Sequence, residues 1–160
     1  EVLDLNELIF EILQLYDNNE GLINIITNCN SDLPKILGDT TQLRQVIHNL
    51  LQNAQFSAIE FKKEDLYPCI NISTESIHFS DPDGKTRTAV SLNISDNGPG
   101  FDEKVIKRAF EPYVTTKKKG TGLGLPVVKK IIEEHGGKIE IQNLENQNGA
   151  RVLILFLKLK

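Results

Sequence analysis

Two asparagines, Asn49 and Asn53, lie four residues apart in the most strongly patterned helix that the sequence predicts. This spacing places both side chains on one face of the helix, beside its apolar stripe. Asparagine forms helices poorly, and a purely structural helix more often carries Glu, Lys or Ala at such positions. An amide oxygen can ligate a hard cation whose other ligands are waters and phosphate oxygens. We therefore treat both as candidate binding residues; the simpler interpretation is a pair of solvated polar side chains.

A second group with chemical potential is Asp96 with the glycines Gly98 and Gly100. Asp96 ends a predicted strand, so its carboxylate is expected to face a crevice rather than bulk solvent. An ionised carboxylate only accepts hydrogen bonds and can therefore read an amino group on a nucleobase. The glycines permit close backbone approach and unusual backbone angles. The alternative is a simple Asx turn over 96–100.

A third group is a glycine-rich run that leads into a predicted helix and consists of Gly120, Thr121, Gly122, Leu123, Gly124 and Leu125. Backbone N–H groups at the start of a helix bind anions without help from any side chain. Lys117, Lys118 and Lys119 add positive charge just before the run, although a lysine run is more often a solvated face. Thr115 and Thr116, like the threonine within the run, could give a hydroxyl to phosphate or cap the helix, and the sequence leaves this open.

Four helices are indicated by apolar residues at helical spacing. The first spans 6–17, with Asn6 as its N-cap. The second and strongest helix contains Asn49 and Asn53, and its apolar stripe consists of Leu43, Val46, Ile47, Leu50, Leu51, Ala54 and Ala58. The third is a short helix capped by Asp102, and the fourth stops at Gly136. The short helix carries Val105, Ile106 and Ala109, and the last carries Val127, Val128, Ile131, Ile132 and His135.

The clearest strand runs over 87–95, where strict alternation of apolar and polar residues predicts a half-buried strand. Other extended segments are expected near 23–27, 33–37, 70–72, 138–142 and 151–158, with turn residues at 80–84. Helices and strands mix without regular βαβ alternation, which favours an α/β two-layer sandwich built on a mixed β-sheet.

The 160 residues suit a single domain, and the net charge of −4 gives no indication of a nucleic-acid surface. No apolar run approaches the roughly 20 residues that a membrane-spanning helix needs. Cys29 and Cys69 have no metal-type spacing, and we expect both to be reduced thiols in a cytoplasmic domain. Because the chain contains no methionine, we expect it to be part of a longer protein.

Four motifs occur in a fixed order: NLLQNA at 49–54, DNGPG at 96–100, FEPY at 110–113 and GTGLGL at 120–125. Together they resemble the N box, first glycine box, F box and second glycine box of the sensor histidine kinases. That family has the GHKL (Bergerat) ATP-binding fold, which is shared with gyrase, heat-shock chaperone ATPases and mismatch-repair ATPases. FEPYVTTK and KKIIEEHGG are most similar to the nitrogen-regulation type. The resemblance covers the chain from about residue 1 to its end.

The resemblance implies a mixed sheet with helices on one face and a nucleotide between the two layers. It makes Asn53 the ligand of the Mg²⁺ that bridges the phosphates of ATP, and Asp96 the contact to adenine. The second glycine box is expected to bind phosphates below a lid at about 101–121, with Phe110 and Tyr113 packing the lid base. We favour Lys117 as the lid lysine that contacts phosphate, because TTK follows the F box directly.

Asn49 distinguishes the reactions that this fold supports. In the related ATPases and serine kinases the equivalent residue is a glutamate that serves as general base. An amide cannot accept a proton at neutral pH, so attack by water is unassisted, which costs about 10²–10⁴ in rate. The chain also departs from the family at Phe56 and Ser57, where many members carry Lys and an aromatic residue, and at Val114 and Thr115, where many carry Arg.

The three histidines, His48, His78 and His135, do not match a phosphoacceptor site, so we expect structural roles for them. The acceptor histidine is expected on a dimerisation domain that precedes Glu1 in the full protein. The chain alone is then expected to bind ATP as a monomer without phosphorylating itself. The full protein is expected to be a homodimer, anchored in a bacterial membrane, that passes phosphate to the receiver domain of a response regulator. The alternatives are a GHKL ATPase or serine kinase, and an interaction module that binds no nucleotide.

Overall fold

The structure, a computed structural model, describes residues 1–16, 23–60, 67–111, 124–145 and 148–160. Its helices are α1 (Leu5–Gln14), α2 (Thr40–Glu60), α3 (Glu103–Ile106) and α4 (Gly124–Glu134). Its strands are β1 (Val2–Leu3), β2 (Asn24–Cys29), β3 (Ile36–Leu37), β4 (Cys69–Ser80), β5 (Thr86–Asp96), β6 (Lys138–Asn143) and β7 (Ala150–Phe156). None of the described helices is both long and apolar enough to span a bilayer.

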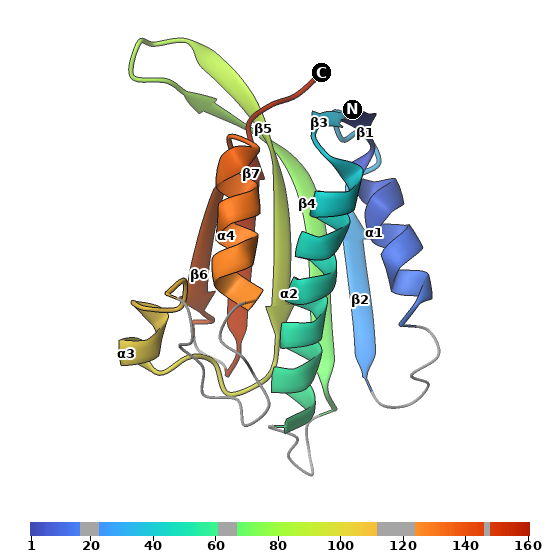
Figure 1. Cartoon of the computed structure of the whole chain (residues 1–160), viewed down its shortest axis with the longest axis vertical. Coiled ribbons are helices and arrows are strands. Elements are labelled where there is room, and N and C mark those ends of the chain that lie inside the picture. The colour runs from blue at the N-terminus through green and yellow to red at the C-terminus, as the bar shows by residue number, and fades with distance from the viewer. Residues whose placement is uncertain (17–22, 61–66, 112–123, 146–147) are drawn as a thin grey trace.

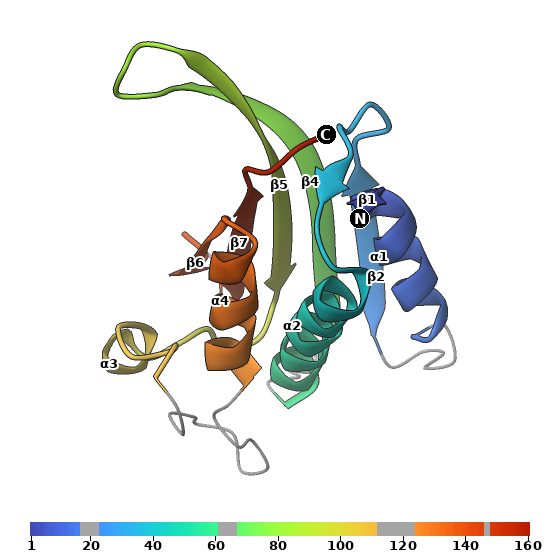
Figure 2. The same cartoon turned by 45° about the horizontal axis from the view of Figure 1, so that its top comes forward.

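Five strands form one sheet in the order β2-β4-β5-β7-β6, while β1 and β3 pair separately. β2 runs parallel to β4, and the other neighbours in the large sheet are antiparallel. The helices α1, α2 and α4 cover one face of this sheet (Figures 1 and 2). The predicted mixed sheet and two-layer α/β sandwich are therefore confirmed.

Helix α2 crosses the sheet and supplies much of the core. Asp39 caps it, because the Asp39 Oδ1 accepts a hydrogen bond from the Gln42 N–H at 3.0 Å. All seven residues of the predicted stripe are buried: Leu43, Val46, Ile47, Leu50, Leu51, Ala54 and Ala58. Each large apolar side chain buried here contributes about 1.5–3 kcal/mol relative to exposure. The packing therefore holds the remaining, polar positions of α2 in a fixed orientation.

Strand β5 lies at the centre of the sheet, between β4 and β7. Val90, Leu92 and Ile94 are buried as predicted. The description of this strand as half-buried was incomplete, because Ala89 and Ser91 on its other face are buried too. Both are small; Ala89 pairs with Ile77 of β4, and Ser91 lies between Glu75 of β4 and Leu155 of β7.

Helix α4 begins at Gly124 and ends before Gly136, which has a φ of +72° that glycine adopts without strain. Pro126 falls in its first turn, where proline is tolerated. In the first helix the predicted N-cap Asn6 was wrong. Asp4 caps α1 by accepting the Glu7 N–H at 3.0 Å. The helix after Asp102 is capped as predicted but ends at Ile106, before Ala109.

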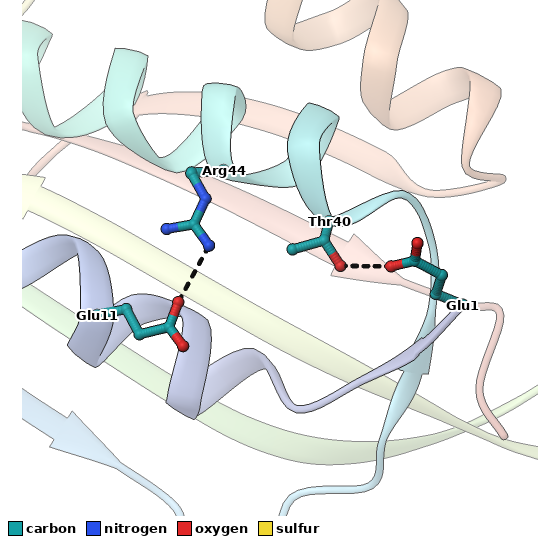
Figure 3. A network of polar contacts seen from close by, with 4 residues as sticks. All are labelled: Glu1, Glu11, Thr40 and Arg44. Atoms are coloured by element: carbon teal, nitrogen blue, oxygen red, sulfur yellow. Dashed lines mark hydrogen bonds and ion pairs between the residues drawn. The ribbon is translucent and has the colours of Figure 1, made fainter.

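Both chain ends lie at the same end of the domain as the start of α2 (Figure 1). Thr40 donates a hydrogen bond to Glu1 Oε2 at 2.8 Å, and Arg44 forms an ion pair with Glu11 at 3.0 Å (Figure 3). These contacts tie the first turns of α2 to the N-terminal segment. The opposite end of the domain carries the end of α2, the start of α4 and the end of β5 (Figure 1).

Candidate functional site

The carboxylate of Asp96 points to the helix side of the sheet. It lies in step with Ile94 and is the direct cross-strand partner of Ile70, and both isoleucines are in the core. The residue is 8% exposed, and its Oδ1 accepts a hydrogen bond from the Gly98 N–H at 2.8 Å. The end of β5 thus places an acceptor on the face of the sheet that the helices cover.

Gly98 lies directly against helix α2. A Cβ at Gly98 would come within 2.2 Å of Ser57 Oγ and 2.7 Å of the Ser57 carbonyl oxygen. No side chain fits in this space, so the glycine is required for close packing of the turn on α2. Ser57 follows Asn53 by one helical turn and shares its face of the helix.

The other glycine motif reaches the same helix at Asn53. A Cβ at Gly124, the first residue of α4, would lie 3.6 Å from the Asn53 Nδ2, which is ordinary van der Waals contact. At the N-terminus of a helix such as α4 the first N–H groups have no partner within the helix and carry a partial positive charge, both of which favour an anion. The candidate cation ligand and the candidate phosphate site are therefore neighbours. Asn49, one turn earlier on α2, is half-buried.

Two successive turns of α2 therefore contact two glycine motifs that are far apart in the sequence. Asn53 lies beside Gly124, and Ser57 lies beside Gly98. This arrangement brings the N box, the first glycine box and the end of the second glycine box to one end of the domain (Figure 2). The sequence motifs alone did not identify Ser57, although its spacing of four from Asn53 was a usable signal.

The turn after Asp96 has further supports that the sequence did not reveal. Asn97 Oδ1 accepts a hydrogen bond from the Cys69 N–H at 2.9 Å, and its Nδ2 donates to the Tyr67 carbonyl at 2.8 Å. Gly149 lies on the opposite side with a φ of +138°, and a Cβ there would be 2.1 Å from the Asp96 carbonyl oxygen. The turn is thus packed against its surroundings on both sides.

Several predicted site residues lie outside the described part of the chain: Tyr113, Thr115, Thr116, Lys117, Gly120, Thr121, Gly122 and Leu123. Of the F box, Phe110 is half-buried, and the Lys129 Nζ of α4 lies 5.0 Å from its ring centroid. Leu125 is partly buried and packs against the core. Within the described residues, the second glycine box thus contributes Gly124 as the contact to Asn53 and Leu125 as an anchor for α4.

Comparison with known proteins agrees with this geometry. Residues 38–160 match the family model described as histidine kinase-, DNA gyrase B-, and HSP90-like ATPase. The chain is 39% identical over 160 residues to sporulation kinase A of Bacillus subtilis (strain 168), covering 99% of this chain and 24% of that protein. It is 34% identical over 129 residues to the sensory histidine kinase/phosphatase NtrB of Rhodobacter capsulatus, covering 80% and 36%.

Among solved structures, the catalytic domain of histidine kinase ThkA superposes with a TM-score of 0.80 at 30% identity, covering 99% of this chain and 97% of that one. The match to NtrB agrees with the predicted similarity to nitrogen-regulation kinases. The chain spans about a quarter to a third of the length of these curated relatives. It belongs to the histidine kinase-, DNA gyrase B-, and HSP90-like ATPase family, as an ATP-binding catalytic domain of the sensor histidine kinase type.

Proposed function

We propose that this chain holds Mg·ATP at the end of α2 and delivers the γ-phosphoryl group to a histidine on a separate dimerisation domain. One observation carries the proposal: α2 contacts the turn after Asp96 through Ser57 and the start of α4 through Asn53. A base-reading carboxylate and an anion-binding helix terminus are thereby placed on either side of one helix end. A nucleotide needs both kinds of contact.

Asp96 is the proposed adenine contact. Its carboxylate is largely buried, faces the helix layer, and has one oxygen held by the Gly98 N–H. As an acceptor-only group it suits the exocyclic amine of adenine and disfavours the carbonyl that guanine carries at that position. Gly98 lacks a side chain, so the turn can pack against Ser57 while its N–H holds the carboxylate. Gly100 completes the turn.

The phosphates are proposed to lie at the start of α4, beside Asn53. The described residues contain no group of three or more His, Cys, Asp or Glu that could hold a metal ion. The amide oxygen of Asn53 is the proposed protein ligand. It fits Mg²⁺, which can take its other ligands from phosphates and water. Bound there, the ion would neutralise charge on the transferred group. Thr115, Thr116, Lys117 and the residues 120–123 stay predicted phosphate contacts.

Asn49 supports transfer to histidine over hydrolysis. The amide cannot remove a proton from water or from a serine hydroxyl. An imidazole nitrogen is already a lone-pair nucleophile, so a site that positions the nucleotide and neutralises its charge is sufficient. Asn49 therefore distinguishes this proposal from its alternative, a GHKL ATPase or serine kinase.

The histidines of this chain support an acceptor elsewhere. His48 Nδ1 is hydrogen-bonded to Tyr16 Oη at 3.0 Å, and His78 Nδ1 to Thr88 Oγ1 at 3.0 Å. His135 uses both ring nitrogens within the fold. We therefore propose that the chain binds ATP as a monomer but does not phosphorylate itself, and that the dimerisation domain of the full homodimeric protein supplies the acceptor.

A response-regulator receiver domain is the proposed destination of the phosphate. The histidine kinase ThkA has been solved in complex with response regulator protein TrrA, and that kinase is 28% identical to this chain, with a TM-score of 0.77. For the full protein we propose a membrane-anchored sensor with this domain on the cytoplasmic side. No part of the proposal involves nucleic acid.

Calorimetric titration of ATP into the folded chain, with and without Mg²⁺ and beside GTP, tests the proposal. We expect Mg²⁺-dependent binding of ATP and at least about tenfold weaker binding of GTP, because a mispaired polar group costs about 1–3 kcal/mol. No binding of ATP by the folded chain would contradict the proposal and favour a module that only contacts partners. Rapid ATP hydrolysis by the chain alone would favour the ATPase.

A further inference from the structure

Asn143, the last residue of β6, forms a two-way hydrogen bond with a residue 42 positions earlier in the chain. Its Oδ1 accepts from the Phe101 N–H at 2.7 Å, and its Nδ2 donates to the Phe101 carbonyl oxygen at 2.8 Å. Phe101 is the first residue after the glycine turn that follows Asp96. The amide therefore fixes the peptide groups on both sides of Phe101.

The same amide also occupies the space beside Gly100. A Cβ at Gly100 would lie 2.8 Å from Asn143 Oδ1 and 3.1 Å from the Gly149 carbonyl oxygen. Gly100 has a φ of +78°, a conformation that most other residues adopt only with strain. Asn143 thus supports the turn at Gly100, where the positive φ favours glycine.

Asn143 is not needed for its own hairpin. The β6–β7 hairpin is closed by backbone groups, with the Leu144 N–H donating to the Gly149 carbonyl at 3.0 Å and Asn143 paired with Ala150 in the ladder. The Asn143 side chain instead forms its two hydrogen bonds with Phe101. Removing the side chain should therefore free Phe101 at the end of the turn and leave the sheet intact.

We propose that Asn143 is a positioning residue for base recognition. By fixing Phe101 it holds the turn in which the Gly98 N–H orients the Asp96 carboxylate. This inference rests on the proposed function, because it assumes that Asp96 reads adenine. It predicts that losing the amide weakens recognition of the base and leaves recognition of the phosphates unchanged.

Titrations with ATP and with inosine triphosphate separate these two contributions. Inosine carries a carbonyl where adenine carries its exocyclic amine, so it gives Asp96 no hydrogen bond to accept. For Asn143→Ala we expect the preference for ATP over inosine triphosphate to fall by about fivefold, the equivalent of one ordinary hydrogen bond. Asn143→Asp keeps the acceptor but loses the donor to Phe101, and it should shift the preference in the same direction.

Asn71→Ala is the matched control, because Asn71 is an exposed asparagine on β4 whose cross-strand partner is Ser95. It should leave the preference for ATP unchanged. If wild type binds ATP with a clear preference but Asn143→Ala keeps that preference, the inference is wrong while the proposed function stands. An equal loss for both nucleotides would also overturn it. If wild type binds neither nucleotide, the proposed function itself fails.

Discussion

The Nε2 of His135, just after α4, accepts a hydrogen bond at 3.0 Å from the backbone N–H of Asp39, the N-cap of α2. The His135 Nδ1 lies 2.8 Å from the Ile131 carbonyl oxygen. Because the Nε2 accepts, the tautomer that satisfies both contacts donates from Nδ1 to the Ile131 carbonyl oxygen. His135 thereby connects the end of α4 to the start of α2. The candidate site lies at the other ends of the same two helices.

For His135→Ala we expect a loss of about 1 kcal/mol in the free energy of unfolding, because the Asp39 N–H loses its partner at the cap. Urea denaturation followed by circular dichroism measures this loss. His78→Ala is the matched control, since His78 bonds Thr88 within the exposed β4–β5 hairpin and lies outside both helices. Equal effects of the two substitutions would contradict a special role for His135.

Gly98 and Gly124 should respond differently to alanine. A Cβ at Gly98 meets the Ser57 backbone oxygen at 2.7 Å, whereas a Cβ at Gly124 meets the Asn53 Nδ2 at an ordinary 3.6 Å. We expect Gly98→Ala to cost roughly 1–3 kcal/mol of stability through overpacking and to weaken ATP binding, and Gly124→Ala to leave stability nearly unchanged. Adding Ser57→Ala should not restore Gly98→Ala, because the backbone oxygen remains. Full restoration would mean that the hydroxyl alone causes the clash.

Asp96→Asn should bind ATP at least about tenfold more weakly, since hydrogen bonds to charged groups contribute about 1.5–3 kcal/mol. If the amide oxygen keeps the Gly98 N–H, the NH₂ group faces the adenine amine, and two donors then oppose each other. Calorimetry measures the affinity, and a thermal melt checks that the variant is folded. Unchanged ATP affinity in the folded variant would remove Asp96 from the site.

Asn49→Glu should raise hydrolysis of ATP by water, by up to about 10²–10⁴, because a carboxylate can act as general base where the amide cannot. Phosphate release under saturating Mg·ATP measures the rate. Asn49→Gln is the control, since it lengthens the side chain without adding a base. Hydrolysis as slow as wild type in an ATP-binding Asn49→Glu variant would count against this explanation of the amide.

Both cysteines should be slow to alkylate in the native chain. Burial raises the pKa of the Cys69 thiol, and it raises the pKa of the Cys29 thiol more than a hydrogen bond with Thr74 lowers it. A raised pKa stabilises the folded state below the unfolded thiol pKa, and this contribution is lost as pH rises through the folded value. Iodoacetamide labelling at pH 8 should be slower in buffer than in urea; equal rates would contradict the burial.

The parts of the fold that follow periodic signals could be predicted from the sequence. The seven-residue stripe of α2 and the alternation of β5 are strong patterns, and the structure buries the predicted faces. Asp4 and Asn6 are both good capping residues two positions apart, so the spacing of apolar residues could not choose between them. Ser91, on the other face of β5, lies between β4 and β7 and is buried, and its neighbours depend on the order of strands in the sheet rather than on the strand itself.

The motif residues of the candidate site could also be named in advance, but their supports could not. Asn143 contacts Phe101 across 42 residues, and two side-chain hydrogen bonds over that separation leave no periodic pattern in the sequence. The contact between Ser57 and Gly98 depends on the angle at which α2 crosses the sheet. That angle follows from the packing of the whole core.

The length of helix α2 affects how precisely the residues of the candidate site are placed. It is a single rod of 21 residues, fastened at its first turn to Glu1 and His135 through Thr40 and Asp39. Ser57 lies about 25 Å along the rod from Thr40 at 1.5 Å per residue, so a tilt of about 2° would displace it by about 0.9 Å. Errors of about 1 Å in placing reacting groups can cost about a hundredfold in rate. The contacts at the far end of the domain therefore add to the packing of the core in fixing the accuracy of the site.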